Sequence, residues 1–390
     1  FDNPYTVGID ADLFFKKASD PGWNFRSFID EPLSSGFSSE RVQGFKEDFL
    51  PILIWNKIYT FLYKFGLSEG RYIGIAVNTI FLVWTALIGL SILKSVKALN
   101  NKTSENFYKF LFCSSGIFWM YGSVHLRESI ITLIISILLK VWIDWIHKKS
   151  FFNLIKLGIV STSFYFTANF IRGGYQNILL IFIVSFLILE LYKIILERKI
   201  RVGQFVFLII LALALVVRSQ NFSELYLGIQ ERFLTYNDIS RGESSADSIG
   251  IILMDQPIII RILLSGFLLL IAPIPFWAGQ ETSFSFYHFF KSSFAIYNYF
   301  TIPLLVIVIK ESIKNFNKID LDKLFLLSLL FQIMVFIGLT SIDSRHFGNF
   351  GIIYILLICN INFKSKIVRE EYKYLLGIMF LLIFFLYLVY

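Results

Sequence analysis

Arginines recur in this chain at the ends of long apolar runs. The five are Arg127, Arg172, Arg218, Arg261 and Arg345. Placing a guanidinium at a membrane boundary costs free energy unless the group is paired with an anion or contacts water. Such residues therefore mark a functional site by default. The planar fork of the side chain binds carboxylates and phosphates bidentately. The pattern predicts a shared site for a phosphate-bearing ligand on one face of a membrane.

Arg127 belongs to the run Ser123-Val-His-Leu-Arg-Glu-Ser129, which joins two apolar segments. Glu128 begins the second segment, where a helix dipole favours a carboxylate and disfavours a guanidinium. A structural role for Glu128 as a helix-end acid therefore stands beside a catalytic one. Arg127 has no such local explanation, so we expect it to bind phosphate.

A second polar motif, Asp343-Ser-Arg-His346, opens an apolar run late in the chain. An internal Asp343–Arg345 ion pair would account for it structurally. The functional alternative assigns Arg345 to a phosphate and His346 to a glycan. Both readings remain open from the sequence.

Two weaker motifs could contact a ligand. Next to Arg172, Gly173 and Gly174 would let backbone amides approach an anion, although the motif taken alone favours a plain interhelical turn with a snorkelling arginine. An aromatic ring beside polar side chains can stack on a sugar, and an interfacial aromatic belt looks the same. The glycan-binding candidates are Trp277, Glu281, His288 and His346.

A general base for a sugar hydroxyl must be a carboxylate or histidine with a usable pKa. The catalytic candidates are Asp10, Asp12 and Glu128, with Glu281 and His288 as further titratable groups. The four histidines lack the spacing of metal ligands, so we expect no protein metal site and no cofactor; a divalent-metal requirement stays open. Cys113 and Cys359 lie in apolar runs and predict no disulfide framework.

The composition requires a membrane. Of 390 residues, 56% are hydrophobic and only 16% are charged, which no soluble domain of this length matches. The continuous apolar runs exclude a β-barrel and predict an all-α polytopic protein with about ten or eleven transmembrane helices in a single domain, 1–390. The expected spans are 73–94, 107–122, 128–146, 154–171, 175–193, 203–217, 287–309, 322–340, 347–361 and 374–390.

The net charge of +8 comes mainly from short loops and predicts orientation; it is not a nucleic-acid signal. Five lysine-rich loops should be cytoplasmic, beginning near Lys94, His147, Lys193, Lys310 and Lys364. The segments 1–71, 122–128, 171–175, 218–286 and 341–347 should then be external, with the arginines among them.

Two external segments should carry short amphipathic helices. In 1–71 we expect a helix capped by Asp10 and an interfacial helix at 50–65. In 218–286, the Pro-interrupted stretch 249–277 is read as an in-plane helix followed by a re-entrant hairpin, with a kinked span as the alternative. Because the numbered chain opens at Phe1 in a polar stretch, we also expect a span to precede it.

Four features together resemble the bacterial GT-C superfamily of integral-membrane glycosyltransferases, most nearly the O-antigen and capsular polysaccharide polymerases. They are acids in a large first external loop (Asp10, Asp12), Leu126-Arg-Glu-Ser after a short span, Ala272-Pro-Ile-Pro-Phe-Trp, and the late Ser344-Arg-His. In that superfamily the first-loop acid serves as base, which implies Asp10 or Asp12. The chain lacks the paired acids of better-known members.

The resemblance implies transfer of a glycan from an undecaprenyl-pyrophosphate carrier to an acceptor glycan on a second lipid. The reaction would occur at the periplasmic face of a bacterial inner membrane, beside other polysaccharide-assembly proteins. An O-antigen ligase, a transferase using a polyprenyl-monophosphate sugar, and a flippase for the same lipid-linked oligosaccharide are the alternatives. A flippase would carry mid-span charges and pseudo-symmetric halves.

Overall fold

The computed structural model describes residues 9–20, 49–67, 71–96, 102–168, 170–171, 175–197, 286–340, 344–361 and 365–389, with single positions 260, 264, 266, 270 and 271. Side chains are described at all of these except 9–13, 71, 197, 287, 288, 338–340, 344, 386 and 389. The described residues form helices and no strand.

The long helices are α5 (Arg71–Ser95), α8 (Glu128–His147), α9 (Phe151–Ala168), α10 (Ile178–Glu197), α15 (Phe286–Lys314), α16 (Leu321–Thr340) and α19 (Lys366–Val389). The short ones are α1 (Ile9–Ser19), α4 (Phe49–Tyr63), α6 (Lys102–Ser114), α7 (Gly116–Ser123), α17 (Ser344–Gly348) and α18 (Gly351–Ile358), with 3₁₀ turns η2 (Tyr175–Asn177) and η3 (Phe316–Lys318).

Within the described residues, five helices are long and apolar enough to cross a membrane. They are Tyr72–Ser95, Glu128–His147, Phe151–Ala168, Tyr175–Leu196 and Phe289–Lys314, and each coincides with an expected span. Most of α8 is buried inside the protein, whereas most of α9 is exposed. An apolar helix that is buried all round is a central helix, so α8 forms the axis of the bundle.

The expected span 107–122 is instead two helices, α6 and α7, that meet at Ser115. Ser115 has an extended backbone (φ −74°, ψ 112°), and the indole Nε1 of Trp119 donates to the carbonyl of Cys113 at 2.6 Å. That bond satisfies one of the carbonyls left open where α6 ends. A Cβ on Gly116 would lie 2.7 Å from the backbone nitrogen of Phe294, so glycine permits close packing of α7 on α15.

The expected span 347–361 is also interrupted. The chain forms α17, turns at Phe350, and continues as the eight-residue α18, every residue of which is buried. Eight residues rise about 12 Å, well short of the roughly 30 Å hydrocarbon core. Periodicity alone could not distinguish this buried core helix from a span.

The lysine-rich loops meet at one end of the bundle, as far as they are described. The Lys140 ammonium donates to Ser95 Oγ at 3.0 Å, His147 pairs with Asp322 at 2.5 Å, and Lys149 with Glu190 at 2.9 Å. The ends of α5, α8 and α10 and the start of α16 are therefore neighbours. Lys310 of α15 pairs with Glu371 of α19, which brings the fifth loop to the same end.

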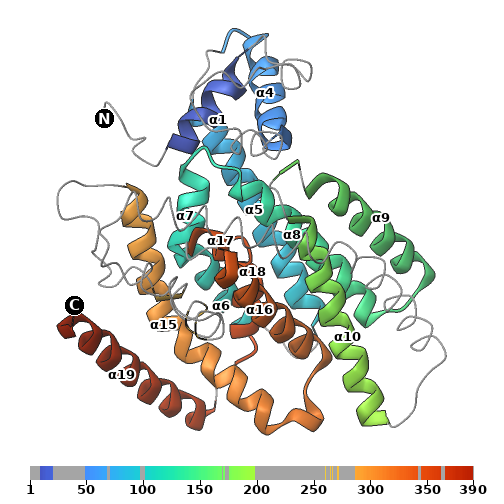
Figure 1. Cartoon of the computed structure of the whole chain (residues 1–390), viewed down its shortest axis with the longest axis vertical. Coiled ribbons are helices and arrows are strands. Elements are labelled where there is room, and N and C mark those ends of the chain that lie inside the picture. Colours follow the sequence, from blue (N-terminus) through green and yellow to red (C-terminus); the bar gives the residue numbers. More distant parts are fainter. Residues whose placement is uncertain are drawn as a thin grey trace.

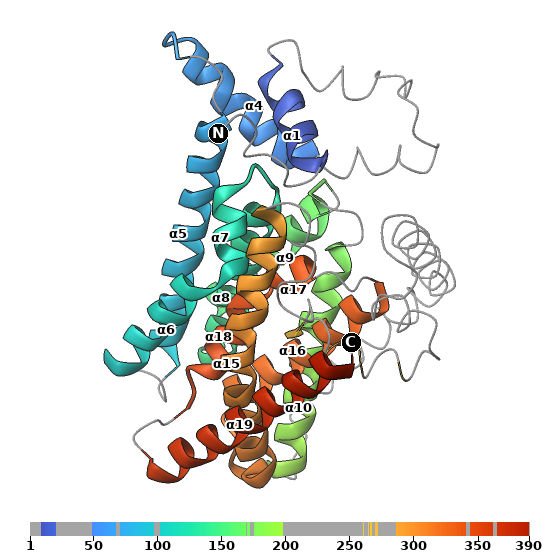
Figure 2. The same ribbon diagram turned by 90° about the vertical axis from the view of Figure 1, so that its left-hand side faces the viewer.

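The opposite end is covered by α1 and α4, which pack together above the bundle (Figure 1, Figure 2). The Asn56 amide donates to the carbonyls of Ala18 and Asp20 at 3.1 and 2.9 Å, which ties α4 to the C-terminus of α1. The helix α1 begins at Ile9, so Asp10 lies in its first turn and is not the N-cap that we expected. We call α1 and α4 together the cap.

The stretch 249–277, for which we expected an in-plane helix and a re-entrant hairpin, lies largely outside the described residues. At its described positions, Leu270 and Ile271 are helical and buried. Their carbonyls accept hydrogen bonds from Asn298 (2.8 Å) and Tyr299 (3.0 Å) of α15. This stretch therefore contacts the bundle. The expected span 203–217 lies outside the described residues.

Candidate functional site

The site is built around the N-terminus of α8. Arg127 is the N-cap, and its carbonyl accepts from the amides of Ile130 and Ile131 at 3.1 and 3.2 Å. Glu128, 1% exposed, stands in the first turn, where the helix dipole favours its carboxylate. The sequence prediction that Glu128 is a helix-end acid is confirmed. The burial means that this acid is held away from bulk water.

Glu128 forms an ion pair with Arg345, whose Nε lies 3.6 Å from Glu128 Oε1. The two side chains are 2% and 16% exposed, respectively. The pair joins the central helix α8 to α17, far apart in the chain. Asp343, the partner that local reasoning suggested for Arg345, lies outside the described residues. The structure thus pairs this guanidinium with Glu128, and the Asp343–Arg345 pair stays a prediction.

Arg345 is held in place through its backbone. The Tyr121 hydroxyl of α7 donates to the Arg345 carbonyl. A Cβ on Gly348 would fall 2.5 Å from that hydroxyl oxygen and 2.4 Å from Ile117, so glycine allows α17 to lie directly on α7. The neighbouring His346 is 7% exposed. Its ring is buried in this conformation, and contact with a sugar would require movement.

The cap reaches the site through aromatic side chains. The Arg127 guanidinium lies 5.6 Å from the centre of the Phe14 ring, a cation–π contact from α1. Asp10 and Asp12 stand on the same helix within four residues of Phe14, although their side chains are not described. The structure therefore brings the helix that carries both first-loop acids against the Arg127–Glu128 motif.

Asn78 of α5 fixes the segment that leads into the site, and sequence reasoning missed it. Its fully buried amide donates to the carbonyls of Val124 and Leu126 at 2.8 and 3.0 Å. Its Oδ1 accepts from the Trp55 indole of α4 at 3.3 Å. One side chain thus connects a span, the cap and the residues immediately before Arg127. The only sequence signal was an asparagine inside an apolar run, which is costly unless it has partners.

His125 was also missed as part of the site. It is 3% exposed, and its ring centre lies 4.1 Å from that of Trp55 and about 6 Å from those of Tyr59 and Phe15. A Cβ on Gly74 would lie 2.1 Å from the His125 ring, so the absence of a side chain at Gly74 lets the ring pack directly against the backbone of α5. His125 therefore packs the cap onto the loop that precedes Arg127.

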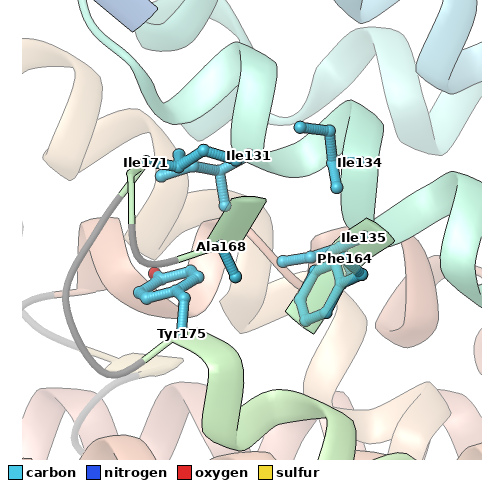
Figure 3. A pocket seen from close by; sticks show the side chains of 7 residues that line it. All are labelled: Ile131, Ile134, Ile135, Phe164, Ala168, Ile171 and Tyr175. Carbon is cyan, nitrogen blue, oxygen red and sulfur yellow. The ribbon is translucent and has the colours of Figure 1, made fainter. Parts of the chain in front are cut away.

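A small apolar hollow adjoins the site. It is lined by Ile131, Ile134 and Ile135 of α8, Phe164 and Ala168 of α9, and Ile171 and Tyr175 of the following turn (Figure 3). The Tyr175 hydroxyl accepts from the Asn349 amide at 2.7 Å, which connects this turn to the end of α17. Ile131 lies one helical turn after Glu128, so the charged pair and the apolar hollow are neighbours along α8.

The remaining predicted residues are only partly placed. Arg172, Arg218, Arg261, Trp277 and Glu281 lie outside the described residues. His288 is in the first turn of α15, with its side chain undescribed. Of the predicted phosphate-binding arginines, the structure describes two: Arg345, whose guanidinium pairs with Glu128, and Arg127, which precedes Glu128 in the chain and whose guanidinium lies over Phe14.

Where the structure describes side chains, no three His, Cys, Asp or Glu residues are grouped so as to hold a metal ion. Comparison with known proteins found no family model, no curated protein and no solved structure that matches this chain.

Proposed function

We propose that the protein is a polysaccharide polymerase or related glycosyltransferase that uses a polyprenyl-pyrophosphate-linked glycan as donor. The observation that carries the proposal is the buried Arg345–Glu128 ion pair, with Arg127 next to Glu128 in the chain, at the end of the helical bundle that the cap covers. Two guanidinium groups suit a pyrophosphate, and a buried carboxylate suits proton transfer. The resemblance to GT-C enzymes points in the same direction.

These groups can each be given a role in the transfer reaction. The acceptor hydroxyl oxygen forms a new bond to the anomeric carbon of the donor sugar, while the bond from that carbon to the pyrophosphate oxygen breaks. The departing bond's electron pair stays on the pyrophosphate, whose developing charge the arginines stabilise. The hydroxyl proton passes to a carboxylate, for which Glu128 and the cap residues Asp10 and Asp12 are the candidates.

The environment of the site suits a lipid-borne substrate. The headgroup would meet the charged N-terminal end of α8, while the first isoprene units would meet apolar side chains such as Ile131 and Phe164. We place the reaction on the side opposite the lysine-rich loops, because short basic loops remain in the cytoplasm. In a bacterial inner membrane that side is the periplasm.

The test is chain extension by the purified protein in lipid vesicles, with an undecaprenyl-pyrophosphate-linked oligosaccharide as both donor and acceptor. Arg127→Ala and Arg345→Ala should each reduce extension at least a hundredfold while membrane insertion is unchanged. Lys149→Ala, which removes a cation from the opposite end, is the matched control and should retain activity. Full-length polymer from the double variant Arg127→Ala/Arg345→Ala would refute the proposal.

The flippase alternative gives a different result in the same vesicles. A flippase would move the lipid-linked oligosaccharide across the bilayer without changing its length. Movement without extension in the unaltered protein would therefore replace the enzyme proposal by the transport one.

A further inference from the structure

Arg345 already has an anionic partner inside the protein. Its guanidinium is only 16% exposed, and the Glu128 carboxylate that pairs with it is 2% exposed. The separation of 3.6 Å is longer than a charge-assisted hydrogen bond, which is typically about 2.7–2.9 Å. A phosphate that binds Arg345 at hydrogen-bond distance would compete with this carboxylate for the same donors.

We propose that the Glu128–Arg345 ion pair is a latch that substrate opens: the pyrophosphate takes Arg345 from Glu128, and the released carboxylate becomes available as a proton acceptor. This inference rests on the proposed function and adds to it a coupling between donor binding and base activation. In the unliganded protein the carboxylate is neutralised. It accepts a proton only when a phosphorylated lipid occupies the site.

The anchoring of the two partners indicates which one moves. Glu128 begins α8, and the loop before it is fixed by Asn78, which binds the carbonyls of Val124 and Leu126. Arg345 stands on the five-residue α17, whose backbone is attached to Tyr121. Since both backbones are held, exchange of partners requires rotation of the Arg345 side chain alone.

Charge favours the exchange. A pyrophosphate carries two or more negative charges against one on Glu128, and it can bind a guanidinium bidentately. Arg127, adjacent to Glu128 in the chain, adds a second cation at the same end of α8.

The latch makes a prediction that a simple binding site does not. Glu128→Gln keeps the shape of the side chain but removes the charge that competes for Arg345. It should therefore bind inorganic pyrophosphate and undecaprenyl pyrophosphate about tenfold more tightly than the unaltered protein, a change of roughly 1.4 kcal/mol, while glycan transfer is lost. Glu128→Asp, which retains the charge but retracts it by one methylene, should show intermediate affinity.

Binding would be measured by calorimetry or tryptophan fluorescence on the protein in lipid nanodiscs. Glu190→Gln, which removes a buried carboxylate at the lysine-rich end, is the matched control and should leave both affinities unchanged. Tighter binding of the lipid alone would assign the latch to the lipid-linked headgroup; tighter binding of both ligands would assign it to the phosphates themselves.

Two results would overturn the latch. If Glu128→Gln bound both inorganic pyrophosphate and undecaprenyl pyrophosphate equally or more weakly, with the unaltered protein still active in transfer, Glu128 would not compete for Arg345, and the proposed function would be left standing. Absence of binding of both ligands in every form of the protein would remove both proposals.

Discussion

Replacing Asn78 with leucine should separate the cap and the Arg127 loop from the bundle. The substitution keeps the size of a buried side chain and removes all three of its hydrogen bonds, two to the carbonyls of Val124 and Leu126 and one from the Trp55 indole. Three polar groups would then be left without this partner in a buried setting. The perturbation is confined to the segment that leads into the site.

The magnitude follows from the three bonds. An unsatisfied buried group costs about 1–3 kcal/mol in water-soluble proteins, and interhelical hydrogen bonds in membranes average about 0.6 kcal/mol. Because the Trp55 bond is long at 3.3 Å, it should contribute least. We expect Asn78→Leu to lower the free energy of unfolding by about 2–4 kcal/mol, and Trp55→Phe, which removes one donor, by about 1 kcal/mol.

Unfolding would be followed by tryptophan fluorescence in mixed micelles as the fraction of denaturing detergent rises. Asn360→Leu is the matched control, since the Asn360 side-chain amide donates to the Leu356 carbonyl four residues earlier and, among the described residues, forms no other hydrogen bond. That variant should change stability by less than about 0.5 kcal/mol. If Asn78→Leu were no more destabilising than Asn360→Leu, the assignment of Asn78 as the link between α5, the cap and the site would be wrong.

Two further predictions concern the two ends of the bundle. Gly348→Ala places a Cβ within 2.5 Å of Ile117 and Tyr121, so α17 must shift. We expect the free energy of unfolding to fall by about 1–3 kcal/mol. We also expect at least a tenfold loss of glycan transfer in the chain-extension assay. Gly158→Ala, with open space around it, is the control, and unchanged transfer in Gly348→Ala would contradict the placement of Arg345. Glu190→Gln removes the carboxylate shared by Lys149 and Lys193. Since both lysine side chains are partly exposed to solvent, we expect the free energy of unfolding to fall by about 1–2 kcal/mol while glycan transfer is retained. Lost transfer at unchanged stability would argue against a purely structural role for Glu190.

The sequence alone was sufficient for the class of the protein and much of its layout. Composition and uninterrupted apolar length required a helical membrane protein, because in lipid every backbone polar group must be satisfied within a helix or closed barrel. The five described helices that are long and apolar enough to cross a membrane, from α5 to α15, fall where the apolar runs predicted spans. The positions of the lysines in short loops likewise distinguished one end of the helical bundle from the other, because the charge of a short loop is a local property of the chain.

Local patterns misled at two places. The runs 107–122 and 347–361 are apolar enough to be spans, yet they form α6 with α7 and the buried α18. Ser115 and Phe350 break these helices because neighbouring elements complete their packing. Such breaks accompany a close approach to α15 or a hydrogen bond from the Asn349 amide to the Tyr175 hydroxyl, which no local pattern records.

The candidate site was only half visible in the sequence. Residue chemistry singled out Arg127, Glu128 and Arg345 one by one, because charged groups beside apolar runs are rare and costly. Tertiary packing decided that Arg345 pairs with Glu128 and that Asn78 and His125 hold the loop before Arg127. The hydrogen bond from Tyr121 to Arg345, for example, joins residues 224 positions apart. Contacts at that separation arise from the summed packing of many helices, whereas helix position and membrane class arise from the transfer energy of each segment on its own.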